Sequence, residues 1–136
     1  MTLVREAMVT EPASLEVTAS AQEAGELLAR PEVRAVFVTR DERLVGVVTR
    51  KTLVREVVAT GRDPRTTPLG EVAEEPYLAL DGGMEVEEAL ALMEHHDLER
   101  VPVVEDGRLV GVLSRVVIQR RLVEDEPLAE GEDQGD

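Results

Sequence analysis

The chain has 136 residues and a formal net charge of −14, because 29 Asp and Glu residues outnumber 15 Lys and Arg residues. This length allows one compact domain or two very small ones, and the acidic balance argues against duplex nucleic-acid binding, which needs clustered basic residues. Cysteine is absent and aromatic residues make up 1%, which excludes disulfides and thiolate catalysis and argues against aromatic stacking on single strands. No apolar run approaches the roughly 20 residues that span a bilayer, so we expect a cytoplasmic protein without membrane contact.

The first part of the chain predicts five elements in the order β-α-β-β-α. Ser20 and Glu23 have the spacing of a capping box, which predicts the start of the first helix. Thr49 stands where the N-cap of the second helix is expected. The predicted elements are a strand at 14–17, a helix that starts after residue 20, strands at 35–38 and 44–48, and a helix over about 50–60.

The later part of the chain predicts the same order. Ser114 stands at the expected N-cap of the final helix, and Asp106-Gly107 is typical of a hairpin turn between two strands. A stretch rich in turn formers, residues 61–68, is the expected linker between the two parts. The predicted elements are an extended segment at 77–80, a helix around 86–93, strands at 101–104 and 109–113, and a helix over about 115–124.

An internal repeat underlies this order. Arg-Leu-Val-Gly-Val at 43–47 recurs at 108–112, an offset of 65. About 55 residues cannot bury a robust core alone. We therefore expect an α+β fold in which two homologous units, residues 1–60 and 69–124, pack through their sheets around a pseudo-two-fold axis.

At two flanking matches the offset differs from 65 by one residue. Pro12 meets Pro76 at 64, and Arg34 meets Arg100 at 66. The second drift also places Val36 opposite Pro102. Short loop insertions would explain both drifts.

Half of the net charge of −14 lies at the end of the chain. From Glu124 to Asp136 seven residues are acidic and none is basic. Such a segment has little to bury, so we expect residues 125–136 to form a disordered acidic tail. The simplest role for such a tail is to keep the protein soluble.

A hydroxyl residue follows the Gly-containing strand of each unit. Thr49 and Ser114 would each offer a hydroxyl beside free backbone N–H groups at the positive end of a helix dipole, which suits an anion. Four arginines suggest two pseudo-symmetric phosphate sites. Two of them follow these hydroxyl residues, and two precede the predicted strands at 35–38 and 101–104. They are Arg34, Arg50, Arg100 and Arg115. From spacing alone, ordinary capping and surface ion pairs stay the favoured alternative.

The combined motifs resemble a tandem pair of CBS domains (cystathionine β-synthase domains), also called a Bateman module. The resemblance covers residues 4–124 and implies the two-unit fold. The matching segments are Met-Val-Thr-Glu-Pro at 8–12, Glu-Ala-Leu at 88–90, Arg-Val-Pro-Val-Val at 100–104, Leu-Val-Gly-Val-Val-Thr at 44–49 and Leu-Val-Gly-Val-Leu-Ser at 109–114.

Proteins of this family commonly bind AMP, ADP, ATP or S-adenosylmethionine in clefts between the two units, as regulatory ligands rather than obligatory cofactors. The resemblance implies that Thr49 and Ser114 contact phosphate or ribose, that Arg34 and Arg100 meet phosphates, that the backbone around Val36 and Pro102 lines the adenine, and that Thr10 and Tyr77 close the pocket.

The chain departs from the family pattern at one position in each unit. The family places an Asp three residues after the Ser or Thr, where it accepts hydrogen bonds from the ribose. Thr52 and Val117 stand there instead. Losing such a bond costs about 1.5–3 kcal/mol, roughly tenfold to a hundredfold in affinity. We therefore expect weakened ribose binding at Thr52 and none at Val117.

The resemblance and these residues together predict a regulatory module. It would bind an adenosyl ligand between its units and signal to a protein partner, without being an enzyme. A ligand-free scaffold for dimerisation and partner docking, with degenerate sites, is the alternative. The two His residues lie together at one helix end, so neither a catalytic triad nor a metal site is predicted. A homodimer through the helices at 50–60 and 115–124 is expected.

Overall fold

The computed structural model describes the backbone of residues 1–124 and the side chains of residues 1–120. The predicted acidic tail lies outside the described residues. None of the described helices combines the length and the apolar character needed to cross a membrane.

The elements of the first repeat follow the predicted order, preceded by a short helix. They are α1 (Val4–Ala7), β1 (Ser14–Glu16), α2 (Ala21–Leu28), β2 (Val36–Arg40), β3 (Arg43–Val48), α3 (Arg50–Leu53) and the π-helix η1 (Val54–Val58). The predicted capping box is confirmed, since the Glu23 amide donates to Ser20 Oγ at 3.2 Å and the Ser20 amide donates to Glu23 Oε2 at 3.0 Å. The predicted second helix is α-helical for one turn only and then widens into η1.

The second repeat follows the same order, with a 3-10 helix in place of α1 and a single α-helix in place of α3 and η1. They are the 3-10 helix η2 (Leu69–Glu71), β4 (Leu80–Asp81), α4 (Val86–His95), β5 (Arg100–Glu105), β6 (Arg108–Ser114) and α5 (Arg115–Glu124). The extended segment predicted at 77–80 pairs only at its end, because β4 begins at Leu80. Asp106 and Gly107 both have positive φ in the β5–β6 turn, as the Asp-Gly pair predicts.

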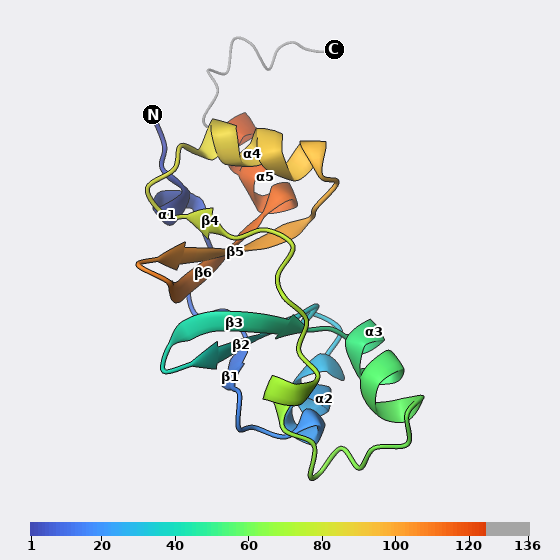
Figure 1. Ribbon diagram of the computed structural model, residues 1–136. Helices are drawn as coiled ribbons and strands as arrows, with labels where there is room; N and C mark the ends of the chain where they lie inside the picture. Colours follow the sequence, from blue (N-terminus) through green and yellow to red (C-terminus); the bar gives the residue numbers. More distant parts are fainter. Residues whose placement is uncertain (125–136) are drawn as a thin grey trace, which may run out of the picture.

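The two units meet through their inner strands, with the helices outside. The strand order is β1-β2-β3-β6-β5-β4, and β3 pairs with β6 only at Arg43 and Arg108. These residues are repeat equivalents, so the pseudo-two-fold axis passes between them. Figure 1 shows the strands facing one another at the centre, with α4 and α5 at one end of the molecule and α2 and α3 toward the other. The α+β fold of two sheet-packed units is confirmed.

Each hydrophobic core is completed by a segment of the other repeat. Val4 and Ala7 are buried among residues of the second unit, including Leu80 and Met93. Leu69, from the second repeat, is completely buried in the core of the first unit. The opening segment of each repeat therefore packs in the core of the other unit.

The repeated glycines allow this exchange. Val47 and Glu74 exchange two backbone hydrogen bonds of 2.8 and 2.9 Å, and Val9 and Val112 do the same at 2.9 and 3.0 Å. A Cβ at Gly46 would lie 3.2 Å from the Glu74 carbonyl oxygen, and a Cβ at Gly111, its repeat equivalent, would lie 2.8 Å from the Val9 carbonyl oxygen. Glycine at these positions leaves room for the crossing backbone.

Candidate ligand-binding site

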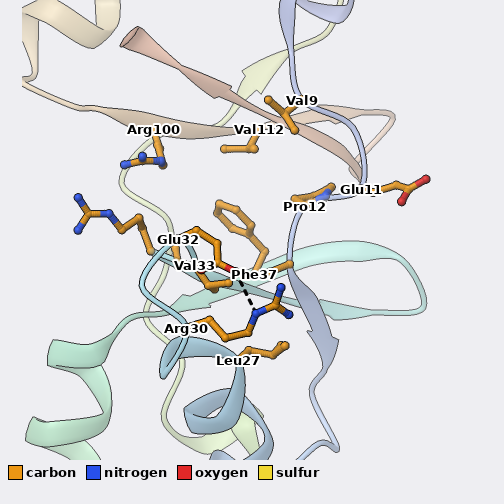
Figure 2. A pocket seen from close by; sticks show the side chains of 13 residues that line it. Val9, Glu11, Pro12, Leu27, Arg30, Glu32, Val33, Phe37, Arg100 and Val112 are labelled. Carbon is orange, nitrogen blue, oxygen red and sulfur yellow. Dashed lines mark hydrogen bonds and ion pairs between the residues drawn. The ribbon is translucent and has the colours of Figure 1, made fainter. Parts of the chain in front are cut away.

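Among the described residues, a large pocket between the units is rich in arginine, and we call it the arginine pocket. It has a volume of about 520 Å³. In Figure 2, Arg100 and Val112 project from the second unit, and Phe37 and Val33 from the first. Its lining consists of Val9, Glu11, Pro12, Ala13, Leu27, Arg30, Glu32, Val33, Arg34, Ala35, Phe37, Arg100 and Val112.

A smaller pocket lies beside it, and we call it the tyrosine pocket. It has a volume of about 160 Å³. Its lining consists of Ala35, Phe37, Val47, Thr49, Pro76, Tyr77, Leu78, Leu98, Arg100, Val101 and Pro102. Tyr77 is 73% exposed, and its hydroxyl lies 3.2 Å from His96 Nδ1.

The pseudo-symmetry relates the two pockets. Val112 and the crossing segment that starts at Val9 line the arginine pocket. Their repeat equivalents, Val47 and the segment that follows Glu74, line the tyrosine pocket. The two cavities are therefore related to one another by the pseudo-two-fold axis.

Strand register corrects the repeat alignment at β2. Val36 pairs with Val48, and Val101 pairs with Leu113, so the offset here is 65. The repeat equivalent of Pro102 is therefore Phe37, and the sequence alignment of Val36 with Pro102 is wrong by one residue. The Val36 side chain is completely buried in the first core, because successive side chains of a strand point to opposite faces.

Phe37 is a site residue that the alignment of the two repeats does not identify. It is 5% exposed and lines both pockets. The unbroken offset of 65 on both sides of β2 could have identified it. The same register makes Ala35, rather than Arg34, the repeat equivalent of Arg100.

Two of the four predicted arginines line the arginine pocket without a described ion-pair partner. Arg34 and Arg100 are exposed, and neither has a carboxylate within ion-pair distance among residues 1–120. Arg30, in contrast, pairs with Glu32 at 3.0 Å, as the dashed line in Figure 2 shows. The guanidinium groups of Arg34 and Arg100 are thus available to an anion.

The other two predicted arginines hold loops instead. Arg50 Nη2 donates to the carbonyl oxygens of Arg30 at 3.0 Å and Val33 at 2.9 Å. Arg115 pairs with Glu99, and its side chain is 18% exposed. Neither arginine lines the two described pockets. Both arginines follow the hydroxyl residues in sequence. In the folded chain their guanidinium groups bond instead to acceptors in the loops before β2 and β5.

Thr49 lines the tyrosine pocket, and its hydroxyl caps α3. Thr49 and Thr52 bond reciprocally, with 3.0 Å between their hydroxyl oxygens. Thr52 is 1% exposed, and its Oγ1 donates to Glu74 Oε2 at 2.8 Å. The pKa of Arg55 is raised by its hydrogen bond to Glu56 and by its ion pair with Glu74. In this arrangement the Thr52 hydroxyl donates its hydrogen to Glu74.

The remaining predicted residues lie outside the two linings. Ser114 is half-buried, and its Oγ accepts from the Val117 amide at 3.5 Å. Thr10 is exposed, although its neighbours Val9 and Glu11 line the arginine pocket. No group of three His, Cys, Asp or Glu side chains in the described part of the chain is placed to hold a metal ion.

Comparison with known proteins identifies the fold family. The model of the CBS domain matches residues 4–59 and 69–124. Hypoxic response protein 1 of Mycobacterium tuberculosis is 38% identical over 84 residues, which are 62% of this chain and 59% of that protein. The match therefore spans less than two thirds of that relative's length. The CBS domain-containing protein YhcV of Bacillus subtilis is 31% identical, over 84% of this chain and 81% of its own length.

Solved structures give the same result. The crystal structure of hypoxic response protein I with two coordinated zinc ions is 30% identical, with a TM-score of 0.75, over 89% of this chain and 99% of that chain. The hexameric CBS-CP12 protein from bloom-forming cyanobacteria shares the fold, with 22% identity and a TM-score of 0.66, over 93% of this chain and 73% of that chain. The chain belongs to the CBS-domain family and carries two CBS domains in tandem.

Proposed function

We propose that this CBS-domain pair is a cytoplasmic, non-enzymatic regulatory module that binds an adenine nucleotide or a related adenosyl ligand and signals its presence to a protein partner. The main support for this proposal is the arginine pocket. Its volume of about 520 Å³ falls in the range of about 300–1,000 Å³ typical of ligand sites. The tyrosine pocket, at about 160 Å³, falls below it.

The chemistry of the arginine pocket suits a nucleotide. Phe37, Leu27 and Val33 supply an apolar wall for a flat ring. Arg34 and Arg100 form no ion pair among residues 1–120, although Glu11 and Glu32 also line the pocket. Guanidinium groups bind phosphate oxygens through paired, charge-assisted hydrogen bonds. AMP, ADP and ATP offer such oxygens, whereas S-adenosylmethionine offers only a carboxylate to these arginines.

Signalling follows from the position of the pocket between two units. Val33 and Arg34 belong to the first unit, and Arg100 and Val112 belong to the second. A ligand that contacts both units binds one relative arrangement better than another, so its binding shifts the population of arrangements. A partner that reads this arrangement would sense the nucleotide.

Removing either pocket arginine is expected to weaken ADP binding. Arg100→Ala and Arg34→Ala each remove a charged hydrogen-bond donor, so we expect a loss of about tenfold to a hundredfold in affinity. Titration calorimetry with ADP measures it. Arg40→Ala is the matched control, because Arg40 is exposed and lines neither described pocket, and it should bind ADP as the unchanged chain does.

A scaffold without a ligand is the alternative function. It is favoured by Thr52 and Val117, which stand where the family pattern has a carboxylate. If AMP, ADP, ATP and S-adenosylmethionine all gave no heat of binding and no thermal shift, nucleotide binding would be overturned in favour of the scaffold. In that case Thr49→Ala and Arg100→Ala should leave partner binding intact.

We also propose that the module forms a homodimer through its outer helices. Val54 and Val58 on η1 are 58% and 71% exposed, and Val116 on α5 is 53% exposed. Sedimentation at micromolar concentration should show a dimer. Val58→Glu would bury a charge in this face, and we expect it to weaken the dimer by about a hundredfold or more.

A charge on another surface is the control for this dimer. Thr18→Glu adds the same charge on the exposed turn after β1 and should leave the dimer unchanged. A monomeric wild-type chain, or equal weakening by both substitutions, would contradict the proposed face.

A further inference from the structure

The two pockets have one wall in common. Ala35, Phe37 and Arg100 line both the arginine pocket and the tyrosine pocket, and no other described residue appears in both linings. Of these three residues only Arg100 carries a charge. A single guanidinium group therefore stands at the boundary between the two cavities.

Pseudo-symmetry would place two cations at this boundary. The pairing of Val36 with Val48 and of Val101 with Leu113 makes Ala35 the repeat equivalent of Arg100. The first unit thus has a methyl group where the second unit has a guanidinium group. The asymmetry comes from the side chains, because the backbone register is the same in both units.

The rest of the two linings is unequal as well. Arg100 is the only charged residue among the described residues that line the tyrosine pocket. The arginine pocket also has Arg30 and Arg34, of which Arg30 is paired with Glu32 at 3.0 Å. An anion in the tyrosine pocket depends wholly on Arg100, whereas an anion in the arginine pocket can engage Arg34 as well.

We infer that Arg100 couples the two pockets negatively. A phosphate-bearing ligand in the arginine pocket engages Arg100 and leaves the tyrosine pocket without a cation. One chain then binds one nucleotide tightly and a second one about tenfold to a hundredfold more weakly, which is the usual effect of losing a charged hydrogen bond. The coupling is reciprocal by thermodynamic linkage. This inference rests on the proposed function, since it takes a nucleotide as the ligand.

Titration calorimetry and native mass spectrometry of the full chain with ADP test this coupling. The wild-type chain should bind one ADP, with a second event at least about tenfold weaker. Ala35→Arg supplies the missing cation and should narrow the gap by about tenfold or more, while the smaller volume of the tyrosine pocket keeps the second event the weaker one. Ala35→Gln is the matched control, similar in length but uncharged, and should keep the wild-type gap whatever its effect on the first affinity.

A second variant tests the coupling without adding bulk at the boundary. Arg100→Gln removes the cation that the first ligand uses, while the second ligand already lacks it. The first event should therefore weaken by about tenfold to a hundredfold, and the gap should narrow by the same factor, because the first ligand keeps only Arg34 as an unpaired described cation. This result does not depend on how well Ala35→Arg folds.

The outcomes separate the coupling from nucleotide binding itself. Two equal ADP events in the wild-type chain, or an unchanged gap in Arg100→Gln, would overturn the coupling and leave the proposed function standing. The same gap in folded Ala35→Arg and Ala35→Gln would do so too. No ADP event in any of these proteins would overturn the proposed function, and the coupling with it.

Discussion

Replacing Gly46 by alanine is expected to lower the free energy of unfolding by about 3 kcal/mol. The new Cβ would lie 2.8 Å from Ala73 Cβ and 3.2 Å from the Glu74 carbonyl oxygen. Both atoms are fixed to the backbone, so the crossing segment must shift. That shift strains the two hydrogen bonds between Val47 and Glu74. Urea unfolding of the variant and of the wild-type chain measures the difference.

The same substitution in a helix provides the control. A Cβ at Gly25, in α2, would lie 3.7 Å from Leu53 Cδ1, which is ordinary contact. Gly25→Ala should therefore raise the free energy of unfolding by about 0.5–1 kcal/mol, because alanine is the better helix former. Equal destabilisation by Gly25→Ala and Gly46→Ala would contradict the crossing as the reason for the repeated glycine.

Truncating Leu69 is the second large effect that we expect. Leu69→Ala should lower the free energy of unfolding by about 3 kcal/mol, because the side chain is completely buried and leaves a cavity. The damage should appear in the first unit, where Leu69 packs with Leu28 and Val48. Amide hydrogen exchange should therefore speed up in β2 and β3 more than in β5 and β6.

An exposed residue on β3 gives the comparison. Val45 is 37% exposed, so Val45→Ala should cost only about 0.5 kcal/mol. If Leu69→Ala loosened β5 and β6 and left β2 and β3 protected, the assignment of Leu69 to the first core would be wrong.

The order of the elements could be predicted from the sequence because its signals are local. The Ser20–Glu23 capping box, the Asp106-Gly107 turn and the repeated Arg-Leu-Val-Gly-Val strand each act within a few residues. The exchange of the opening segments could not be predicted. Nothing local to Val4 or Leu69 says which of two similar sheets each will cover, since either core offers an apolar surface.

The site was predictable only in part, for a reason of geometry. Arg34 and Arg100 were found because they flank strands that border the cleft. Val36 was aligned with Pro102 through a slip of one residue, and in a strand such a slip exchanges the core face and the pocket face. The roles of Arg50 and Arg115 depend on loops that lie near them only in the folded chain.

The exchanged segments have a consequence for the order in which the chain is made. The first core can close once Leu69 and Val72 have been synthesised, because its other buried members precede them. The second core includes Val4 and Ala7 together with Ile118. These two early residues have no partner from the second unit in this core until Leu80 and the residues after it emerge from the ribosome. Contacts so distant in sequence slow folding, and they leave the start of the nascent chain dependent on its end.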